Sequence, residues 1–238
     1  MPEDVFGLES LRGGRGKMSK LWPIEEGPIK PLSHFSSVMV TVYLASTNPG
    51  KLREFRHAAE LRGINVELLP GIESLPVCDE DGNTFEENAC KKALYYSQKT
   101  EGMVFADDSG LCVDALGSGP GVFSARYAGP QADDEANNQK LLAELAGVPP
   151  SKRTAHYACV IALAQQGKIL TVVEGYAEGL IQNAPRGTGG FGYDPYFYFP
   201  PLNRTFAELS LEEKFEVSHR GAAFRNLLDF LASPDGRN

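Results

Sequence analysis

The stretch LASTNPGKLREF (residues 44–55) places a lysine where a helix normally disfavours one. Asn48 suits the N-cap of a helix and Pro49 its first position, so a helix is predicted to begin here. Lys51 then lies in the first turn, where the helix dipole disfavours a cation. Backbone N–H groups at a helix start, together with a lysine, form an anion site, although the stretch lacks the glycine and hydroxyl pattern of a P-loop. A solvated surface lysine is the alternative.

A second predicted helix start carries the same anomaly. Ser218 suits an N-cap, and His219 and Arg220 follow it directly. Two helices with cationic groups at their positive ends indicate a common cause, such as one negatively charged or carbonyl-rich ligand between them. The alternative is that these side chains point to water.

Two adjacent carboxylates, Asp107 and Asp108, are predicted to end a buried strand. Ligands of α/β sheets gather beyond the carboxyl ends of strands. Because consecutive strand residues face opposite sides, only one carboxylate is expected to enter a cleft, and the other is expected to cap the Ser109–Gly110 turn. Carboxylates of this kind suit Mg²⁺, which proteins hold through one or two acids plus substrate phosphates. A turn without metal is the alternative.

The segment TFEENACKKA (residues 84–93) is predicted to begin a helix through a capping box between Thr84 and Glu87. Asn88 and Lys92 lie four residues apart and share one helix face. Lys92 could therefore reach a phosphate, although a solvated lysine is the default. The acidic loop 79–81 before this helix is most simply solvated, or else supplies one metal contact.

The string GGFGYDP (residues 189–195) is too rich in glycine for a helix or a strand. Its glycines permit close backbone approach and positive φ angles. Phe191 and Tyr193 offer flat faces on which a base could stack, and stacking of this kind contributes about 1–3 kcal/mol in single-strand binders. The alternative is a tight turn whose aromatic rings belong to the core.

Composition narrows the class of protein. The 238 residues carry a net charge of −8, which argues against a protein that grips nucleic-acid backbone. No apolar run approaches the length that spans a bilayer. The four cysteines form no CxxC pair, so reduced thiols in a cytoplasmic protein are expected.

Residues 1–37 are rich in Gly, Pro and Ser, and we expect a disordered N-terminal extension or an over-long gene start. From residue 38 to 238 one domain is expected, in which strands and helices alternate around a mixed sheet, an α/β fold. Helices are predicted near 51–62, 84–98, 131–146 and after Ser218, strands near 38–45, 64–69 and 102–108, a hairpin over 155–181 and a loop over 186–195.

Several strings together resemble one family, the inosine triphosphate pyrophosphatases, also called the Ham1 family. The matching strings are LASTNPGK, TFEENACKKA, ADDSGLCVDALGSGPGVFSARYAG, GTGGFGYDPYF and TFAELSLEEKFEVSHRGAA, in family order over about 38–232. The resemblance implies an elongated mixed sheet in two lobes, with the substrate between them, and a homodimer. It also implies Mg²⁺-dependent hydrolysis of ITP, dITP and XTP to the monophosphate and pyrophosphate, which cleanses the nucleotide pool.

The resemblance also assigns roles to individual residues. Asp108 matches the catalytic acid/base, which also touches the metal, and Asp79 with Glu80 beside it matches the metal-side carboxylate. The remaining matches are substrate contacts: Ser46, Thr47, Asn48, Pro49, Gly50, Lys51 and Lys92 towards the phosphates, Phe191, Gly192, Tyr193, Asp194, Lys214, His219 and Arg220 towards the base, and Ser109 as a further substrate contact. Thr47 stands where the family often has Gly, and Asp79 where it commonly has Glu.

Two other functions are compatible with parts of the pattern. A Maf-like nucleotide pyrophosphatase has related chemistry but prefers modified pyrimidines, and the SHR and GGFGYDP strings favour the purine interpretation. A sensor that binds purine triphosphates without turnover has less need for acids near phosphates, so Asp107, Asp108 and the acidic loop favour an enzyme.

Overall fold

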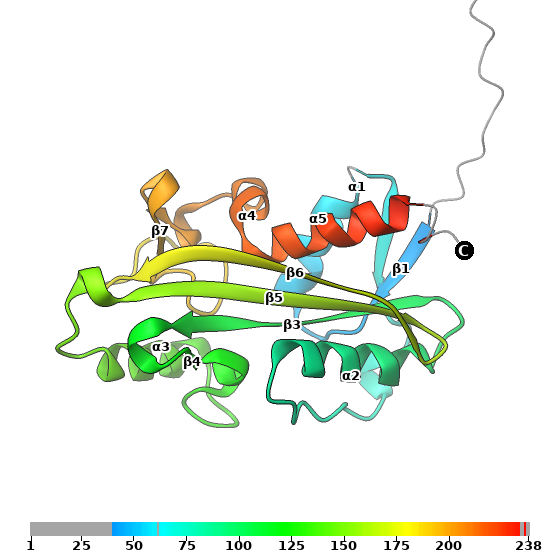
Figure 1. Cartoon of the computed structure of the whole chain (residues 1–238), viewed down its shortest axis with the longest axis horizontal. Helices are drawn as coiled ribbons and strands as arrows, with labels where there is room; N and C mark the ends of the chain where they lie inside the picture. The colour runs from blue at the N-terminus through cyan, green and yellow to red at the C-terminus, as the bar shows by residue number, and fades with distance from the viewer. Residues whose placement is uncertain (1–39, 61, 234–235, 237–238) are drawn as a thin grey trace, which may run out of the picture. The chain divides into compact units, whose positions relative to one another are not determined.

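The computed structural model describes residues 40–60, 62–233 and 236 (Figure 1). The expected extension, residues 1–37, lies outside the described residues. Eight strands form one mixed sheet in the order β2-β1-β3-β5-β6-β7-β8, with β4 paired to β3. The strands are β1 Val40–Leu44, β2 Ile64–Leu68, β3 Met103–Val113, β4 Gly119–Pro120, β5 Thr154–Gln165, β6 Lys168–Ile181, β7 Phe197–Phe199 and β8 Arg204–Thr205. The mixed α/β fold is therefore confirmed.

Parallel and antiparallel pairing divide the sheet at β3. Strands β2, β1 and β3 run parallel, while β5 to β8 continue the sheet in antiparallel fashion. The predicted hairpin is β5–β6, joined by Gln166 and Gly167, both with positive φ as a two-residue hairpin turn requires. In this sheet Leu44 at the end of β1 pairs with Phe105 of β3, two residues before the first of the two aspartates.

Helices cover both faces of the sheet (Figure 1). They are α1 Pro49–Glu60, α2 Phe85–Ser97, α3 Asp134–Glu144, α4 Leu211–Val217 and α5 His219–Ala232. Phe55 of α1 and Phe224 of α5 pack with Phe105 of β3 in one apolar cluster. Ala89 of α2 packs on Val104 in a second cluster on the other face. Within the described residues, no helix is both long and apolar enough to cross a membrane.

Two local predictions need correction, and one helix was missed. Strand β3 does not end at Asp108 but runs to Val113, because Ser109 and Gly110 remain in the ladder with β5. The box at Thr84 is only half formed: Thr84 accepts from the Glu87 N–H, but Glu87 accepts from the N–H of Asn83. Helix α4 was not expected from the sequence.

Candidate active site

The loop after β1 leads into α1 through the predicted cap. Asn48 Oδ1 accepts the N–H groups of Gly50 at 2.8 Å and Lys51 at 3.3 Å, and Ser46 Oγ accepts the N–H of Asn48. Gly50 tolerates no side chain, because a Cβ there would lie 2.9 Å from the ring of Phe191. The cap therefore fixes the first turn of α1 against the glycine-rich loop.

Lys51 has a partner inside the protein, which explains its place at the helix start. Its Nζ lies 2.9 Å from Asp107 Oδ2, and Arg220 Nε lies 3.5 Å from the same oxygen. Burial raises the pKa of Asp107, but the cations of Lys51 and Arg220 outweigh it and bring the pKa to about 2. The carboxylate of Asp107 is thus ionised and offsets the unfavourable helix dipole at Lys51. It does not cap a turn at Ser109–Gly110, because no turn exists there.

Glu54 extends this group of charges towards α4 and α5. Its carboxylate accepts from Lys214 Nζ at 2.8 Å and from Arg220 Nη1 at 2.7 Å. Lys214 also pairs with Asp194 at 2.6 Å. Burial disfavours the ionised form of Glu54, yet the charges of Arg220 and Lys214 prevail and lower its pKa. With Lys51 and Asp107 these side chains form a buried network, which we call the balanced network, of three cations and three carboxylates.

His219 differs from its basic neighbours because it is neutral. Burial lowers its pKa well below the ordinary value, and the charges of Arg220 and Lys214 lower it further. Its ring stacks on Tyr157, with centroids 4.5 Å apart and planes 9° apart. Nδ1 is buried without a hydrogen-bond partner in the described residues. His219 therefore presents a neutral imidazole to the cavity that it lines.

The glycine-rich loop 186–195 is held from both sides. Asp194 Oδ2 accepts the N–H of Phe191 at 2.9 Å, Asp134 Oδ2 accepts the N–H of Gly192 at 2.6 Å, and Asn138 donates to the Gly192 carbonyl. The ring of Phe191 lies 4.9 Å below the ammonium group of Lys214. These contacts fix Phe191 at the cavity wall.

The two aromatic residues of this loop have different surroundings. Tyr193 is buried and donates its hydroxyl to the carbonyl of Ser124, whereas Phe191 is half-buried. Tyr193 therefore anchors the loop, although it also lines the cavity, and Phe191 is the ring available as a platform.

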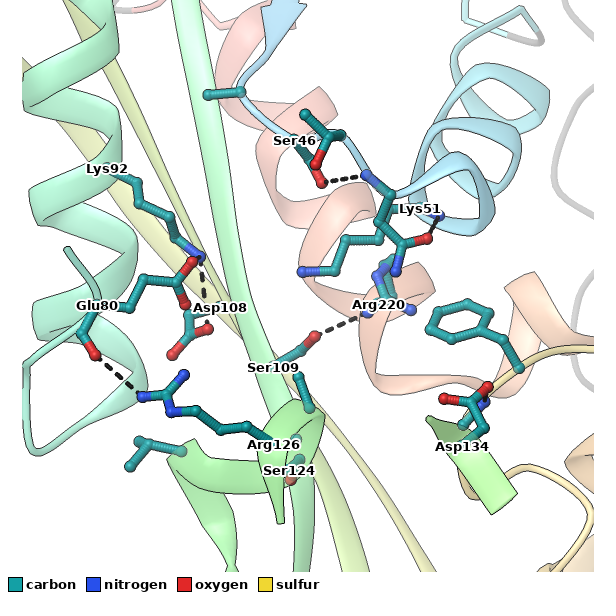
Figure 2. A pocket seen from close by; sticks show the side chains of 18 of the residues that line it. Ser46, Lys51, Glu80, Lys92, Asp108, Ser109, Ser124, Arg126, Asp134 and Arg220 are labelled. Atoms are coloured by element: carbon teal, nitrogen blue, oxygen red, sulfur yellow. Dashed lines mark hydrogen bonds and ion pairs between the residues drawn. The ribbon is translucent and has the colours of Figure 1, made fainter. Parts of the chain in front are cut away.

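Asp108 faces Lys92 of α2 (Figure 2), whereas Asp107 contacts Lys51 of α1 from the other face of the sheet. Asn88 donates to its Oδ2 at 3.1 Å, and Lys92 Nζ lies 3.5 Å from Oδ1. Lys92 also donates to the carbonyl of Asp107 and pairs with Glu80 at 3.2 Å. Burial raises the pKa of Asp108, and the charges of Lys92 and Lys51 offset only part of that rise. Neighbouring aspartates thus have pKa values displaced in opposite directions.

These side chains border one cavity of about 510 Å³. Figure 2 shows Lys92, Glu80 and Asp108 on one side of β3, and Lys51 with Arg220 on the other. The predicted residues that line the cavity are Ser46, Thr47, Asn48, Lys51, Glu80, Lys92, Asp108, Ser109, Phe191, Gly192, Tyr193, Asp194, Lys214, His219 and Arg220. Pro49, Gly50 and Asp79 do not line it, and Asp79 is exposed.

The acidic side of the cavity has the character of a site for a hard cation. Glu80 and Asp108 both contact Lys92, and the three groups together carry one excess negative charge. Among the described residues no cluster of three or more His, Cys, Asp or Glu side chains could hold a metal on its own. Two carboxylates completed by substrate phosphates are the arrangement that Mg²⁺ prefers. Glu80 and Asp108 therefore fit Mg²⁺ in the presence of a polyphosphate.

Several cavity residues were not found from the sequence. Glu54 resembled a solvated helix residue, and its position three residues after Lys51, on the same helix face, was the available signal. Arg126 and Asp134 also line the cavity. Arg126 lies in the SARYAG part of a family string, but neither its type nor its position in the string indicated a role.

Comparison with known proteins identifies the family to which the chain is similar. A model of the Ham1 family matches residues 42–230. The chain is 45% identical over 194 residues to a dITP/XTP pyrophosphatase of Bacillus subtilis (strain 168), covering 82% of this chain and 98% of that protein. It is 50% identical over 195 residues to a dITP/XTP pyrophosphatase of Geobacter sulfurreducens, covering 81% and 97%.

Solved structures agree with the sequence relatives. A HAM1 protein from Coxiella burnetii superposes with a TM-score of 0.73 at 43% identity, covering 82% of this chain and 99% of that one. The Ham1 protein of Staphylococcus aureus gives a TM-score of 0.71 at 38% identity, covering 83% and 100%. By its sequence and by its fold, the chain belongs to the Ham1 family.

Proposed function

We propose that this chain hydrolyses non-standard purine nucleoside triphosphates, namely ITP, dITP and XTP, to the nucleoside monophosphate and pyrophosphate with the help of Mg²⁺. Its relatives named dITP/XTP pyrophosphatase support a hydrolase that acts on triphosphate anhydrides. The observation that carries the proposal is the single cavity with acids and lysines at one end and a neutral imidazole with an aromatic platform at the other. Such a cavity suits a ligand with a charged chain and a planar base.

The phosphate chain lies, in this proposal, between the start of α1 and α2. The loop 46–51 lines the cavity through Ser46, Thr47 and Asn48 at the start of α1, and Lys51 and Lys92 approach from the two faces of β3. A helix start with a lysine favours phosphate oxygens. Both lysines then stabilise the negative charge that develops on the departing pyrophosphate.

Asp108 is the proposed catalytic base. Its contact with Lys92 holds it beside the proposed phosphates. Its raised pKa makes its carboxylate a better proton acceptor, which can orient or deprotonate a water molecule. Glu80 and Asp108 would hold the Mg²⁺, which neutralises phosphate charge when bound. The metal-side carboxylate then falls on Glu80, one residue after the position that the family resemblance indicates. Asn88 fixes the Asp108 carboxylate from the other side.

The base is proposed to stack on Phe191 and to be read by His219. A neutral imidazole can donate to the purine 6-oxo group, whereas the 6-amino group of adenine is itself a donor and leaves the site unpaired. Sites built on such hydrogen bonds discriminate by roughly 10⁴-fold. Arg220, already bonded to Glu54 and Ser109, supports this end of the cavity. Rejection of GTP requires a further element near its 2-amino group.

The cellular role follows from this chemistry. Removal of ITP, dITP and XTP cleanses the nucleotide pool, so we propose a cytoplasmic enzyme that acts on free nucleotides rather than on nucleic acid. A homodimer is the assembly proposed for it.

A product assay tests the proposal. The full-length chain is incubated with ITP, XTP, GTP or dATP, with Mg²⁺ or with EDTA, and pyrophosphate and orthophosphate are measured separately. We expect pyrophosphate from ITP and XTP only when Mg²⁺ is present. Orthophosphate as the first product would contradict the proposed release of pyrophosphate. Equal rates on all four nucleotides would remove the proposed purine readout.

A further inference from the structure

The cations that line the cavity differ in whether the protein already neutralises them. Lys51 contacts Asp107, Lys92 contacts Glu80 and Asp108, and Lys214 and Arg220 belong to the balanced network. Arg126 lines the same cavity, yet no carboxylate of the described residues lies within ion-pair distance of it. Arg126 is thus the lining cation in the described chain whose charge has no acidic partner.

Arg126 nevertheless occupies a fixed position. It ends the short 3-10 helix η3 (Gly121–Arg126), where Ser124 Oγ accepts the N–H of Leu111 at 2.9 Å and donates to the Gly121 carbonyl. Gly110 lets η3 approach β3, since a Cβ at this position would overlap Ser124.

A second clamp holds the chain on both sides of Arg126. Asn137 of α3 accepts the N–H of Ala128 at 2.8 Å and donates to the carbonyl of Ala125 at 3.2 Å. The backbone around Arg126 is therefore fixed to β3 through η3 and to α3 through Asn137.

The guanidinium group extends towards the acidic end of the cavity (Figure 2). Arg126 Nη2 donates to the Glu80 carbonyl at 3.0 Å, and the described residues accept no hydrogen bond from its other N–H groups. A guanidinium has five N–H donors in a planar fork that matches two phosphate oxygens. Most of these donors are unused, and they lie beside the residues proposed to hold Mg²⁺ and activate water.

We infer that Arg126 binds oxygens of the triphosphate next to Asp108 and supplies positive charge that the protein has not already neutralised. This inference rests on the proposed function for the identity of the anion. Lys51 and Lys92 have to share their charge with Asp107, Glu80 and Asp108. Arg126 has no carboxylate to share its charge with, although its Cζ lies 5.4 Å from the centre of the Phe123 ring, and it remains bonded to the Glu80 carbonyl while it binds the ligand.

The test compares Arg126→Gln and Arg126→Lys with the full-length parent chain. Arg62→Gln is the matched control, because Arg62 pairs with Asp229 at the surface and does not line the cavity. Calorimetry measures the affinity for inorganic pyrophosphate at saturating Mg²⁺, and steady-state kinetics measure kcat/KM for ITP and dATP. Thermal unfolding verifies that each variant is folded.

For Arg126→Gln we expect pyrophosphate affinity and kcat/KM to fall about tenfold to a hundredfold, as for loss of a hydrogen bond to a charged group. The ratio of ITP to dATP should not change, because both nucleotides share the triphosphate. Arg126→Lys should recover part of the loss, and Arg62→Gln should match the parent.

Pyrophosphate affinity within about twofold of the parent in Arg126→Gln would overturn the inference, since a charged contact contributes more than that. So would a variant that needs more Mg²⁺ but binds pyrophosphate normally once Mg²⁺ is saturating, because Arg126 would then act only through Glu80. Pyrophosphate binding does not depend on turnover. A parent that binds pyrophosphate through Arg126 but fails to release it from ITP would contradict the proposed function and leave this inference standing.

Discussion

Asp107 and Asp108 are neighbours in β3, but their carboxylates point to opposite faces of the sheet and meet different cations. Asp107 contacts Lys51 and Arg220, and its pKa falls to about 2. Asp108 contacts Lys92, and burial raises its pKa. A pair of titratable groups whose environments separate their pKa values is a frequent sign of divided roles in catalysis. In the proposed mechanism, Asp107 organises the charges of the balanced network and Asp108 accepts the proton.

Asp108→Asn should abolish turnover while nucleotide binding survives. The amide keeps the shape of the side chain but cannot take a proton from water, so kcat should fall by at least about 10²-fold. Stopped assays with ITP measure kcat, and calorimetry measures ITP affinity. Asp114→Asn is the control, because Asp114 bonds Thr154 outside the cavity. Full activity in Asp108→Asn would remove Asp108 from the mechanism.

The pH dependence of kcat/KM should reflect the protonation of Asp108. Activity requires ionised Asp108, so kcat/KM should fall as the pH is lowered through a pKa above 3.8. Lys92 favours the ionised form, and its removal in Lys92→Gln should therefore move this acid limb to higher pH. Lys91→Gln, which removes an exposed partner of Asp81, should leave the limb in place. An acid limb that does not move in Lys92→Gln would show that another group controls it.

Asp107→Asn should destabilise the folded chain at pH 7 by about 3 kcal/mol, because it leaves buried cations without their carboxylate. The folded pKa lies near 2, below the ordinary 3.8, so this stabilisation is complete above pH 3.8 and is lost as the pH falls through 2. The difference between parent and variant should consequently shrink in acid. Urea unfolding at pH 7 and pH 2.5 measures it. A constant difference at both pH values would contradict the charge argument.

Gly175→Ala should weaken purine selectivity, although Gly175 itself is not one of the residues proposed to contact the nucleotide. Gly175 of β6 lies directly against the first turn of α5, and a Cβ would overlap the His219 carbonyl and the Ala223 N–H. Displacement of His219 should lower the ITP-to-dATP ratio of kcat/KM on the order of tenfold. A Cβ in Gly102→Ala would meet the side chains of Tyr43 and Thr100, away from α5, and this control should leave the ratio unchanged. An unchanged ITP-to-dATP ratio in Gly175→Ala would show that the position of His219 does not determine base selectivity.

Features set by local physics were predictable from the sequence. The Asn48 and Ser218 caps, the Gln166–Gly167 turn and the starts of α1 and α5 depend on residues a few positions apart. The capping box from Ser210 to Glu213 is a further local signal of this kind, and it marks the start of α4.

Features set by distant contacts were not predictable in the same way. Glu54 lies in a polar stretch of α1, and only the arrival of Lys214 and Arg220 makes it a buried acid. Gly110 suggested a turn because its real neighbour, Ser124 of η3, is absent from the local pattern. The partner of Lys51 was expected to be a ligand, whereas the fold itself supplies Asp107.

The balanced network has a consequence for how the two ends of a nucleotide respond to salt. Five of its six charged groups are buried and the sixth, Lys51, is half-buried, and the charges cancel, so dissolved ions screen them little. The base would therefore be recognised almost independently of ionic strength. In the proposed binding mode, Arg126 and Lys92 act on the highly charged phosphate chain, and their attraction for it weakens as the salt concentration rises. Rising salt should thus slow capture of every triphosphate equally and leave the choice among bases intact.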